Sequence, residues 1–376
     1  MAETSGGRAA GGGCGRAVGE PTAMRREIEA VPDVVARLVA EGMPEIESAA
    51  AAIRAADPGW VSLVARGTSD HAAIHLRYLI ETELGIPAGM AAPSTVTIYG
   101  AQLRWRGGLV IAVSQSGRSP DIVAVLDAAR AGGAVTVAIV NDAESPLAAA
   151  ADHVIDCRAG EELSVAATKS YVAQLAAGAA LVAALAPSPA LGVALPELPA
   201  LLRSSLATAA AVIDDDAPIV AEFAASERSI VIGRGFEFPT ALEIALKLKE
   251  TSRLFAEGYS AADFSHGPVV LTGPEVPILA IRPDGRMGPL VDEGIEAALA
   301  TGSVPWIVGG SGVEDALLPG QDPERVLSLP LPRDLPEALV SLATILPGQL
   351  LAEAVARRRG YDPDAPPGLR KVTLTR

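Results

Sequence analysis

Cysteine is scarce in this sequence of 376 residues. The two cysteines, Cys14 and Cys157, have no metal-ligand spacing and no disulfide framework around them. This argues against a disulfide-rich secreted scaffold and against a cysteine-based metal site, and it fits a reducing compartment. We therefore expect a cytoplasmic protein without a metal centre.

Positive charge is also in short supply. The chain has 30 lysines and arginines against 45 aspartates and glutamates, so its formal net charge is −15. Binding to nucleic-acid phosphates needs a basic face. A nucleic-acid partner is therefore not expected, and an anionic ligand would have to be held by local hydrogen-bond donors.

A long, strongly apolar run is missing too. The longest apolar tract, from Val172 to about Leu195, is mostly alanine, contains Gln174 and is interrupted by Pro187 and Pro189. A membrane span needs about 20 strongly apolar residues. This tract therefore predicts a buried helix followed by a linker, and we expect no membrane partner.

The sequence does contain a repeating α/β pattern. Hydrophobic residues make up 49% of the chain, which is enough material for the cores of two domains. Short β-branched runs lead into helical stretches, and this alternation predicts parallel sheets covered on both faces. The runs are residues 60–65, 109–113, 135–140, 229–232, 276–281 and 304–308.

The two halves of the chain align at one offset, the 168 residues that separate Gly67 from Gly235. Several short matches in one register predict duplication of an α/β unit, although chance matching of glycine and valine is an alternative. The copies differ after their second strand, where only the first has a serine-rich loop suited to phosphate. The matching pairs are residues 66–67 with 234–235, 117–118 with 285–286, and 139–140 with 307–308.

Two polar loops follow predicted strands, at residues 67–70 and 114–119. In an open parallel sheet, ligands bind beyond the carboxyl ends of the strands. Hydroxyls, an amide side chain, free backbone N–H groups and a helix N-terminus together suit a phosphate monoester. One such loop alone would more often be an ordinary turn and N-cap, but two at adjacent strand ends favour phosphate. A third segment, residues 160–170, either closes over the same ligand or simply caps a helix, with Lys169 in solvent.

A charged stripe marks the helix expected to begin near Pro239. Glu243, Lys247 and Glu250 are spaced i, i+4, i+7 and share one face of an otherwise apolar helix, so they are expected to line a cleft. The alternative is an exposed, ion-paired face. His266, in the sequence Ser-His-Gly-Pro, follows this helix and is a candidate acid/base group, although a lone loop histidine is more often structural.

These segments resemble the isomerase half of glutamine-fructose-6-phosphate aminotransferase and the related amino-sugar-phosphate deaminases and isomerases without a glutaminase half. The likeness runs from Met24 to the C-terminus, and five motifs occur in the family's order. It implies an α/β protein of two tandem sugar-isomerase (SIS) domains, each a three-layer αβα sandwich with a five-stranded parallel sheet. It also implies a phosphorylated sugar as ligand and no cofactor.

The resemblance carries site roles onto particular residues. Glu250 corresponds to the base that moves a proton between C1 and C2, and His266 to the histidine that helps open the sugar ring from a neighbouring subunit of a homodimer. Lys371 corresponds to the tail lysine that closes over the sugar. The expected substrate contacts, with Lys247 of the charged stripe added, are Ser69, Ser114, Gln115, Ser116, Ser119, Val165 and Lys247.

Several departures separate this chain from the aminotransferases. Two segments are more similar to the deaminases. They are the loop sequence Ser-Gly-Arg-Ser-Pro-Asp, in which Arg118 replaces a glutamate, and the C-terminal sequence Lys-Val-Thr-Leu-Thr-Arg. Ala2, not cysteine, follows Met1, which predicts that this chain does not release ammonia from glutamine. We expect conversion of glucosamine 6-phosphate to fructose 6-phosphate and ammonia. The alternatives are amination of fructose 6-phosphate, action on a related sugar phosphate, and a non-catalytic sugar-phosphate sensor.

The expected organisation has six parts. The first 22 residues lack the apolar run of a signal peptide and predict a flexible leader. The tail contains three prolines and would be disordered by default, although alternation from Val372 to Thr375 suggests docking. The parts are a leader at 1–22, a helical segment at 23–44, the phosphate-binding SIS domain at 45–190, a linker at 191–210, a second SIS domain at 211–356, and a tail closing the site at 357–376.

Overall fold

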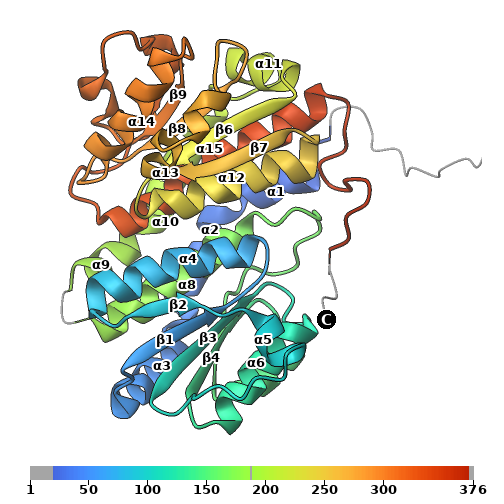
Figure 1. Ribbon diagram of the computed structural model, residues 1–376, viewed down its shortest axis with the longest axis vertical. Coiled ribbons are helices and arrows are strands. Elements are labelled where there is room, and N and C mark those ends of the chain that lie inside the picture. The colour runs from blue at the N-terminus through green and yellow to red at the C-terminus, as the bar shows by residue number, and fades with distance from the viewer. Residues whose placement is uncertain (1–19, 187–188, 372–376) are drawn as a thin grey trace, which may run out of the picture.

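The computed structural model describes residues 20–186 and 189–371. The expectations for Cys14, Pro187, most of the leader and the stretch from Val372 to Thr375 lie outside these residues. The described chain forms two five-stranded parallel sheets (Figure 1). The first contains β1 (Trp60–Val64), β2 (Ala88–Met90), β3 (Gly108–Ser114), β4 (Val135–Val140) and β5 (His153–Asp156), and the second β6 (Arg228–Gly233), β7 (Phe255–Ser260), β8 (Ile278–Arg282), β9 (Trp306–Gly309) and β10 (Val326–Ser328).

Both sheets have the same topology. Their strand orders are β2-β1-β3-β4-β5 and β10-β9-β8-β6-β7, which are the same order once the second is read from its other edge. All the strand pairs are parallel, and Trp60 of β1 aligns with Gly108 of β3. The predicted α/β architecture of two tandem sandwiches is confirmed.

Helices connect successive strands and cover both faces of each sheet (Figure 1). The longer ones are α1 (Ala23–Glu29), α2 (Val31–Glu41), α3 (Met43–Ala56), α4 (Thr68–Leu79), α6 (Pro120–Ala131), α8 (Lys169–Leu185), α10 (Leu198–Ala210), α11 (Pro218–Ala225), α12 (Glu237–Ser252), α14 (Gly288–Ala300) and α15 (Glu337–Arg358). The short ones are α5 (Pro93–Thr97), α7 (Pro146–Ala150), α9 (Ala190–Ala194), α13 (Ala261–Ser265), η1 (Ile80–Leu84), η2 (Leu195–Glu197), η3 (Pro268–Leu271), η4 (Val313–Ala316) and η5 (Pro323–Arg325).

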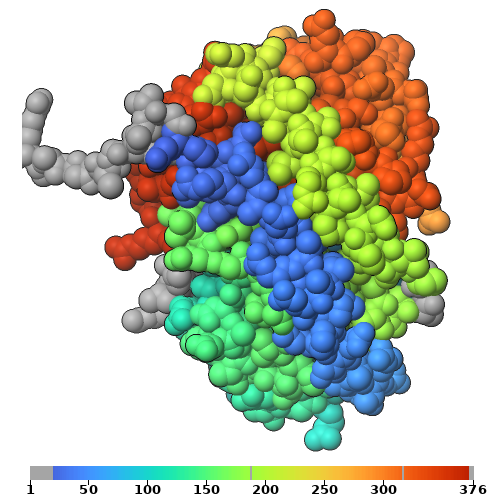
Figure 2. Space-filling model, turned by 180° about the vertical axis from the view of Figure 1, so that it is seen from behind, coloured from blue at the N-terminus to red at the C-terminus, as the bar shows by residue number. Residues whose placement is uncertain are grey.

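One apolar core joins the two domains. It contains buried residues of the inward faces of both sheets together with α2, α4, α8, α10, α12 and α15, which lie between the sheets (Figure 1). Two smaller cores lie on the outer faces, under α6 and α7 in the first domain and under α13 and α14 in the second. The N-terminal helices run along the back of the molecule across both domains (Figure 2). Side chains at the domain boundary are therefore held by packing from both sides.

Several helices bear on the sequence expectations. The predicted buried helix is α8, which is buried from Lys169 to Val182. The expected linker 191–210 is helical throughout, as α9, η2 and α10. Helix α12 begins at Glu237, near Pro239 as expected. Pro239 is tolerated in this first turn because the first backbone N–H groups of a helix have no intrahelical partner. Among the described helices, α15 alone is long and apolar enough to cross a membrane, and its apolar stretch is entirely buried inside the fold.

Candidate active site

A cavity of about 330 Å³ lies where the carboxyl end of the first sheet meets α12 and the C-terminal tail. The expected catalytic and substrate-contact residues line it, except His266. Glu243 was also expected to line a cleft, but it is fully buried and does not line this cavity. The lining residues are Arg66, Gly67, Thr68, Ser69, Ser114, Gln115, Ser116, Ser119, Ile122, Val165, Ala167, Lys247, Glu250, Leu369, Arg370 and Lys371.

The loop after β3 forms one wall of the cavity. Gly117 has a φ of +62°, which favours glycine, and its N–H donates to Ser114 Oγ at 3.0 Å. A Cβ at this position would collide with Ser145, the N-cap of α7, so the close approach also requires glycine. Ser119 is the N-cap residue of α6, and within the described chain its side chain makes no capping hydrogen bond. Hydroxyls, backbone N–H groups and a helix N-terminus thus face the cavity together.

The loop after β1 forms the neighbouring wall. Gly67 has a φ of +55° and leads into α4. Ser69 is 6% exposed and its Oγ accepts a hydrogen bond of 3.0 Å from Gln174 Nε2 on α8. The Arg66 guanidinium donates through Nε and Nη2 to Asp121 Oδ2, at 3.0 and 2.9 Å, and Asp121 belongs to the first turn of α6. This ion pair ties the two loops together, while Arg66 keeps part of its surface towards the cavity.

Two residues of the charged stripe of α12, Lys247 and Glu250, form the opposite wall, and most of the stripe is buried. Glu243 and Lys247 are fully buried, whereas the Glu250 side chain is 25% exposed. Lys247 Nζ lies 2.5 Å from Glu250 Oε2 and 3.3 Å from Glu243 Oε1. Burial would lower the pKa of the Lys247 ammonium, but the two carboxylates outweigh it and raise the pKa. The alternative of an exposed, ion-paired face is therefore wrong.

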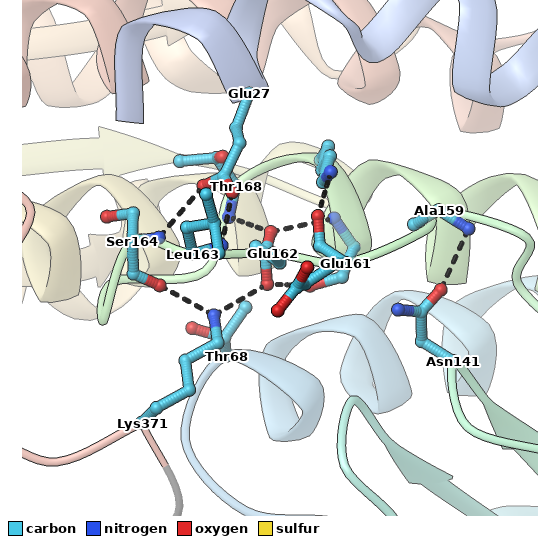
Figure 3. Close-up of polar contacts among 12 residues, drawn as sticks. Glu27, Thr68, Asn141, Ala159, Glu161, Glu162, Leu163, Ser164, Thr168 and Lys371 are labelled. Carbon is cyan, nitrogen blue, oxygen red and sulfur yellow. Dashed lines mark hydrogen bonds and ion pairs between the residues drawn. The ribbon is translucent and has the colours of Figure 1, made fainter. Parts of the chain in front are cut away.

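The third loop, residues 160–168, is built around a buried carboxylate (Figure 3). Glu162 accepts hydrogen bonds from Thr168 N at 2.9 Å, from Ser170 N at 3.1 Å and from Ser170 Oγ at 2.7 Å. Lys371 Nζ donates to Glu162 Oε2 at 3.0 Å and to Ser164 O at 2.6 Å. Burial acts to raise the pKa of Glu162, but the Lys371 charge and these hydrogen bonds lower it. Lys169 is buried as well, which excludes the alternative of a solvated lysine at this helix start.

The N-terminal helix and the tail hold this loop from outside. Glu27 of α1 accepts from the backbone N–H groups of Leu163 and Ser164 (Figure 3). Asp364 of the tail accepts from the N–H groups of Ala23 and Met24, at 2.7 and 2.8 Å, and so caps α1. Sequence reasoning missed these contacts. The glutamates of the loop were visible, but nothing local indicated their partners.

His266 lies outside the cavity of its own chain. It follows α13 and is exposed, and it does not line the cavity.

The loop after β8 in the second domain is equivalent to the loop after β3 in the first, and it differs from it as predicted. Met287 N donates to Glu337 Oε1 at 3.4 Å, and a Cβ on Gly285 would collide with the same carboxylate. In the second domain, a carboxylate of the protein itself therefore accepts from the backbone N–H at this loop.

No group of three or more histidine, cysteine, aspartate or glutamate side chains that could hold a metal ion occurs in the described ranges. The cavity instead offers serine hydroxyls, backbone N–H groups, several cations and one partly exposed carboxylate. Such a set can hold an anionic group at one end and move a proton at the other.

The chain belongs to the SIS domain family, whose model matches residues 57–184 and 222–302. It is 36% identical over 325 residues to the glutamine–fructose-6-phosphate aminotransferase of Gloeobacter violaceus, with 84% of this chain and 52% of the relative covered. The chain thus spans about half the length of the curated relatives it matches.

Solved structures agree with this assignment. The C-terminal domain of the glucosamine-fructose-6-phosphate aminotransferase of Francisella tularensis superposes with a TM-score of 0.83 at 26% identity, covering 94% of this chain and all of that one. A protein of Silicibacter pomeroyi DSS-3, named provisionally as a phosphosugar isomerase, gives a TM-score of 0.80 at 37% identity, covering 92% of this chain and all of that one.

Proposed function

We propose that this chain is a sugar-phosphate isomerase that converts glucosamine 6-phosphate to fructose 6-phosphate and ammonia. One observation carries the proposal. The two serine loops of the first domain and the Glu250–Lys247 pair of the second face the same cavity of about 330 Å³. Two of the relatives, one named as an aminotransferase and one named as a phosphosugar isomerase, support the substrate class.

The phosphate would bind between the two serine loops, where hydroxyls and backbone N–H groups converge at the start of α6. A dianion suits this wall because Arg66, beside the loop after β1, also lines the cavity. Anchoring the phosphate there would direct the other end of the sugar towards α12. Glu250 is the partly exposed carboxylate on that side, so it is the residue able to exchange a proton with the substrate.

The reaction balances without a coenzyme. After ring opening, Glu250 would remove the proton from C2 while the C1 carbonyl oxygen gains one, giving an enolamine. Return of the proton to C1 and loss of one from nitrogen gives the C2 imine, and addition of water then releases ammonia and leaves the ketone. Lys247 would hold Glu250 in place through the 2.5 Å contact, and Lys371 would close the cavity from the tail.

The test is turnover of glucosamine 6-phosphate by the purified full chain, with ammonia and fructose 6-phosphate measured separately. Equal release of both is expected. Glu250→Gln should bind substrate but lose turnover by at least about a hundredfold, since general-base catalysis contributes on the order of 10² to 10⁴. A matched control is Glu257→Gln, a glutamate on β7 outside the cavity. Folded protein that releases no ammonia at millimolar substrate would refute the proposal.

Amination of fructose 6-phosphate is the second candidate, because several relatives are named as aminotransferases. Running the assay from fructose 6-phosphate with ammonium, and separately with glutamine, distinguishes the directions. Product formed faster with glutamine than with ammonium would favour the aminotransferase. Binding of sugar phosphates without turnover in either direction would favour a sensor.

We also propose that His266 of one subunit completes the cavity of a partner copy in a homodimer. Its exposure, and its position outside the cavity of its own chain, support this. Mixing Glu250→Gln and His266→Ala chains tests it, because a mixed dimer would contain one intact site. Random reassociation should restore about one quarter of wild-type activity. No recovery, with mixed dimers present, would contradict donation between subunits.

A further inference from the structure

A histidine of the first domain, His71, contacts Glu243 of the charged stripe. His71 lies on α4, one turn after Thr68, and its Nδ1 is 2.7 Å from Glu243 Oε2 on α12. The other oxygen of Glu243 accepts from Thr68 Oγ1 at 3.0 Å and lies 3.3 Å from Lys247 Nζ. Among the described residues, His71 is the hydrogen-bond partner of Oε2. An ionised carboxylate only accepts hydrogen bonds, so His71 donates from Nδ1.

Lys247 is shared between two carboxylates. Its Nζ contacts Glu250 Oε2 at 2.5 Å, Thr68 Oγ1 at 3.0 Å and Glu243 Oε1 at 3.3 Å. An ammonium has three N–H groups, so each oxygen can receive one. Lys247 and Glu243 are both fully buried, which leaves no bulk water to replace a lost donor. The position of the ammonium therefore depends on how well Glu243 is satisfied by its other partners.

We propose that His71 is a positioning residue for the proton-transfer step. His71 donates a hydrogen bond to Glu243 Oε2 and so stabilises part of the negative charge of that carboxylate. Glu243 then attracts the Lys247 ammonium less strongly, and the ammonium stays in contact with Glu250. Glu250 is then held at one place on the cavity wall. This inference rests on the proposed function, since it assigns Glu250 the reacting carboxylate.

The geometry distinguishes this role from simple packing. The donor atom is Nδ1, and an asparagine side chain places its amide nitrogen at nearly the same distance from the backbone. An asparagine can therefore keep the bond to Glu243, whereas a leucine of similar size cannot. The role also needs no positive charge on the imidazole, because a neutral N–H is sufficient as donor.

The experiment compares wild type with His71→Asn and His71→Leu in steady-state turnover of glucosamine 6-phosphate. His71→Leu should lower kcat by about 10- to 100-fold with little change in KM, because a misplaced reacting group costs rate rather than phosphate affinity. His71→Asn should stay within about threefold of wild type on the same reasoning. A matched control is His153→Leu, on β5 outside the cavity, which should leave both constants unchanged.

Two results would overturn the inference. Equal loss of kcat in the asparagine and leucine variants would show that the donor at Nδ1 is not what matters. A rise in KM at unchanged kcat would show that His71 acts on the phosphate side or on domain packing. Thermal unfolding of each variant separates these outcomes from loss of fold.

A crystal structure of His71→Leu decides the point without any activity measurement. The inference expects Lys247 Nζ to move towards Glu243 and away from Glu250. An unchanged contact of 2.5 Å between Lys247 and Glu250 would refute it. If wild type turns over no sugar phosphate, the proposed function fails, whereas this structural outcome still tests the role of His71.

Discussion

Replacing Glu237 with glutamine should change how the stability of the protein depends on pH. Glu237 is the first residue of α12, is 1% exposed, and accepts a hydrogen bond of 2.8 Å from Thr344 Oγ1. Burial raises its pKa from 4.5 to about 7, although hydrogen bonds from threonine side chains lower it in part. Between these two values the unfolded chain has lost the proton and the folded chain has kept it. Stability contributed by this group is therefore present below pH 4.5 and is lost as the pH rises towards 7.

The rise in the pKa of Glu237 from 4.5 in the unfolded chain to about 7 in the folded chain corresponds to roughly 3 kcal/mol of unfolding free energy. Glutamine keeps an acceptor for Thr344 but cannot ionise, so the variant should not show this loss. His75 has the opposite effect, because burial lowers its pKa from 6.5 to about 4 and stability falls as the pH drops through that range. The His75 contribution is the same in both proteins and cancels in their difference.

The assay is urea unfolding followed by circular dichroism at several pH values from 4.5 to about 7. The free energy of unfolding of Glu237→Gln, minus that of wild type, should rise by about 3 kcal/mol over this range. Glu144→Gln, at an exposed position, is the control and should show a difference independent of pH. A constant difference for Glu237→Gln as well would refute the argument from burial.

Three further predictions concern the cavity and the core. Glu162→Gln removes the charged acceptor of Lys371 and should lower kcat/KM about tenfold or more, since hydrogen bonds to charged groups contribute about 1.5–3 kcal/mol. An unchanged kcat/KM would contradict this. Gly117→Ala should destabilise the fold by about 1–3 kcal/mol in thermal unfolding and raise KM in steady-state kinetics. Gly192 has open space around it, so the control Gly192→Ala should do neither. Cys157 should resist alkylation until the protein unfolds, because burial raises the pKa of its thiol; peptide mass spectrometry that finds it labelled in folded protein would contradict this.

The strands found from the sequence and those missed differ in position. The six apolar runs correspond to β1, β3, β4, β6, β8 and β9, which are the inner strands of the two sheets. The four edge strands, β2, β5, β7 and β10, were not among them. An inner strand is paired on both sides and covered on both faces, so its sequence is a continuous apolar run. An edge strand has no such requirement, and β2 is only three residues long, Ala-Gly-Met.

The candidate site was predictable only where its chemistry is local. The serine loops stand at the ends of apolar strands, and the α12 stripe has helical spacing, so both could be recognised along the chain. The contacts of Glu27 with Leu163, of Glu162 with Lys371 and of His71 with Glu243 join residues 136, 209 and 172 positions apart. No local pattern encodes such pairs, because they arise only when distant parts of the chain pack together. Lys371 was expected through family resemblance rather than from spacing.

The cap that Asp364 places on α1 joins residues 341 positions apart. Closing so long a loop carries an entropic penalty, and contacts of this separation form after local ones. During synthesis the N-terminal helices emerge first and domains generally fold in that order. The Glu27-bound loop can therefore receive Lys371 only after the whole second domain has been synthesised. A chain cut before Leu369 would lack the three tail residues that line the cavity, Leu369, Arg370 and Lys371, so the proposed turnover should be lost.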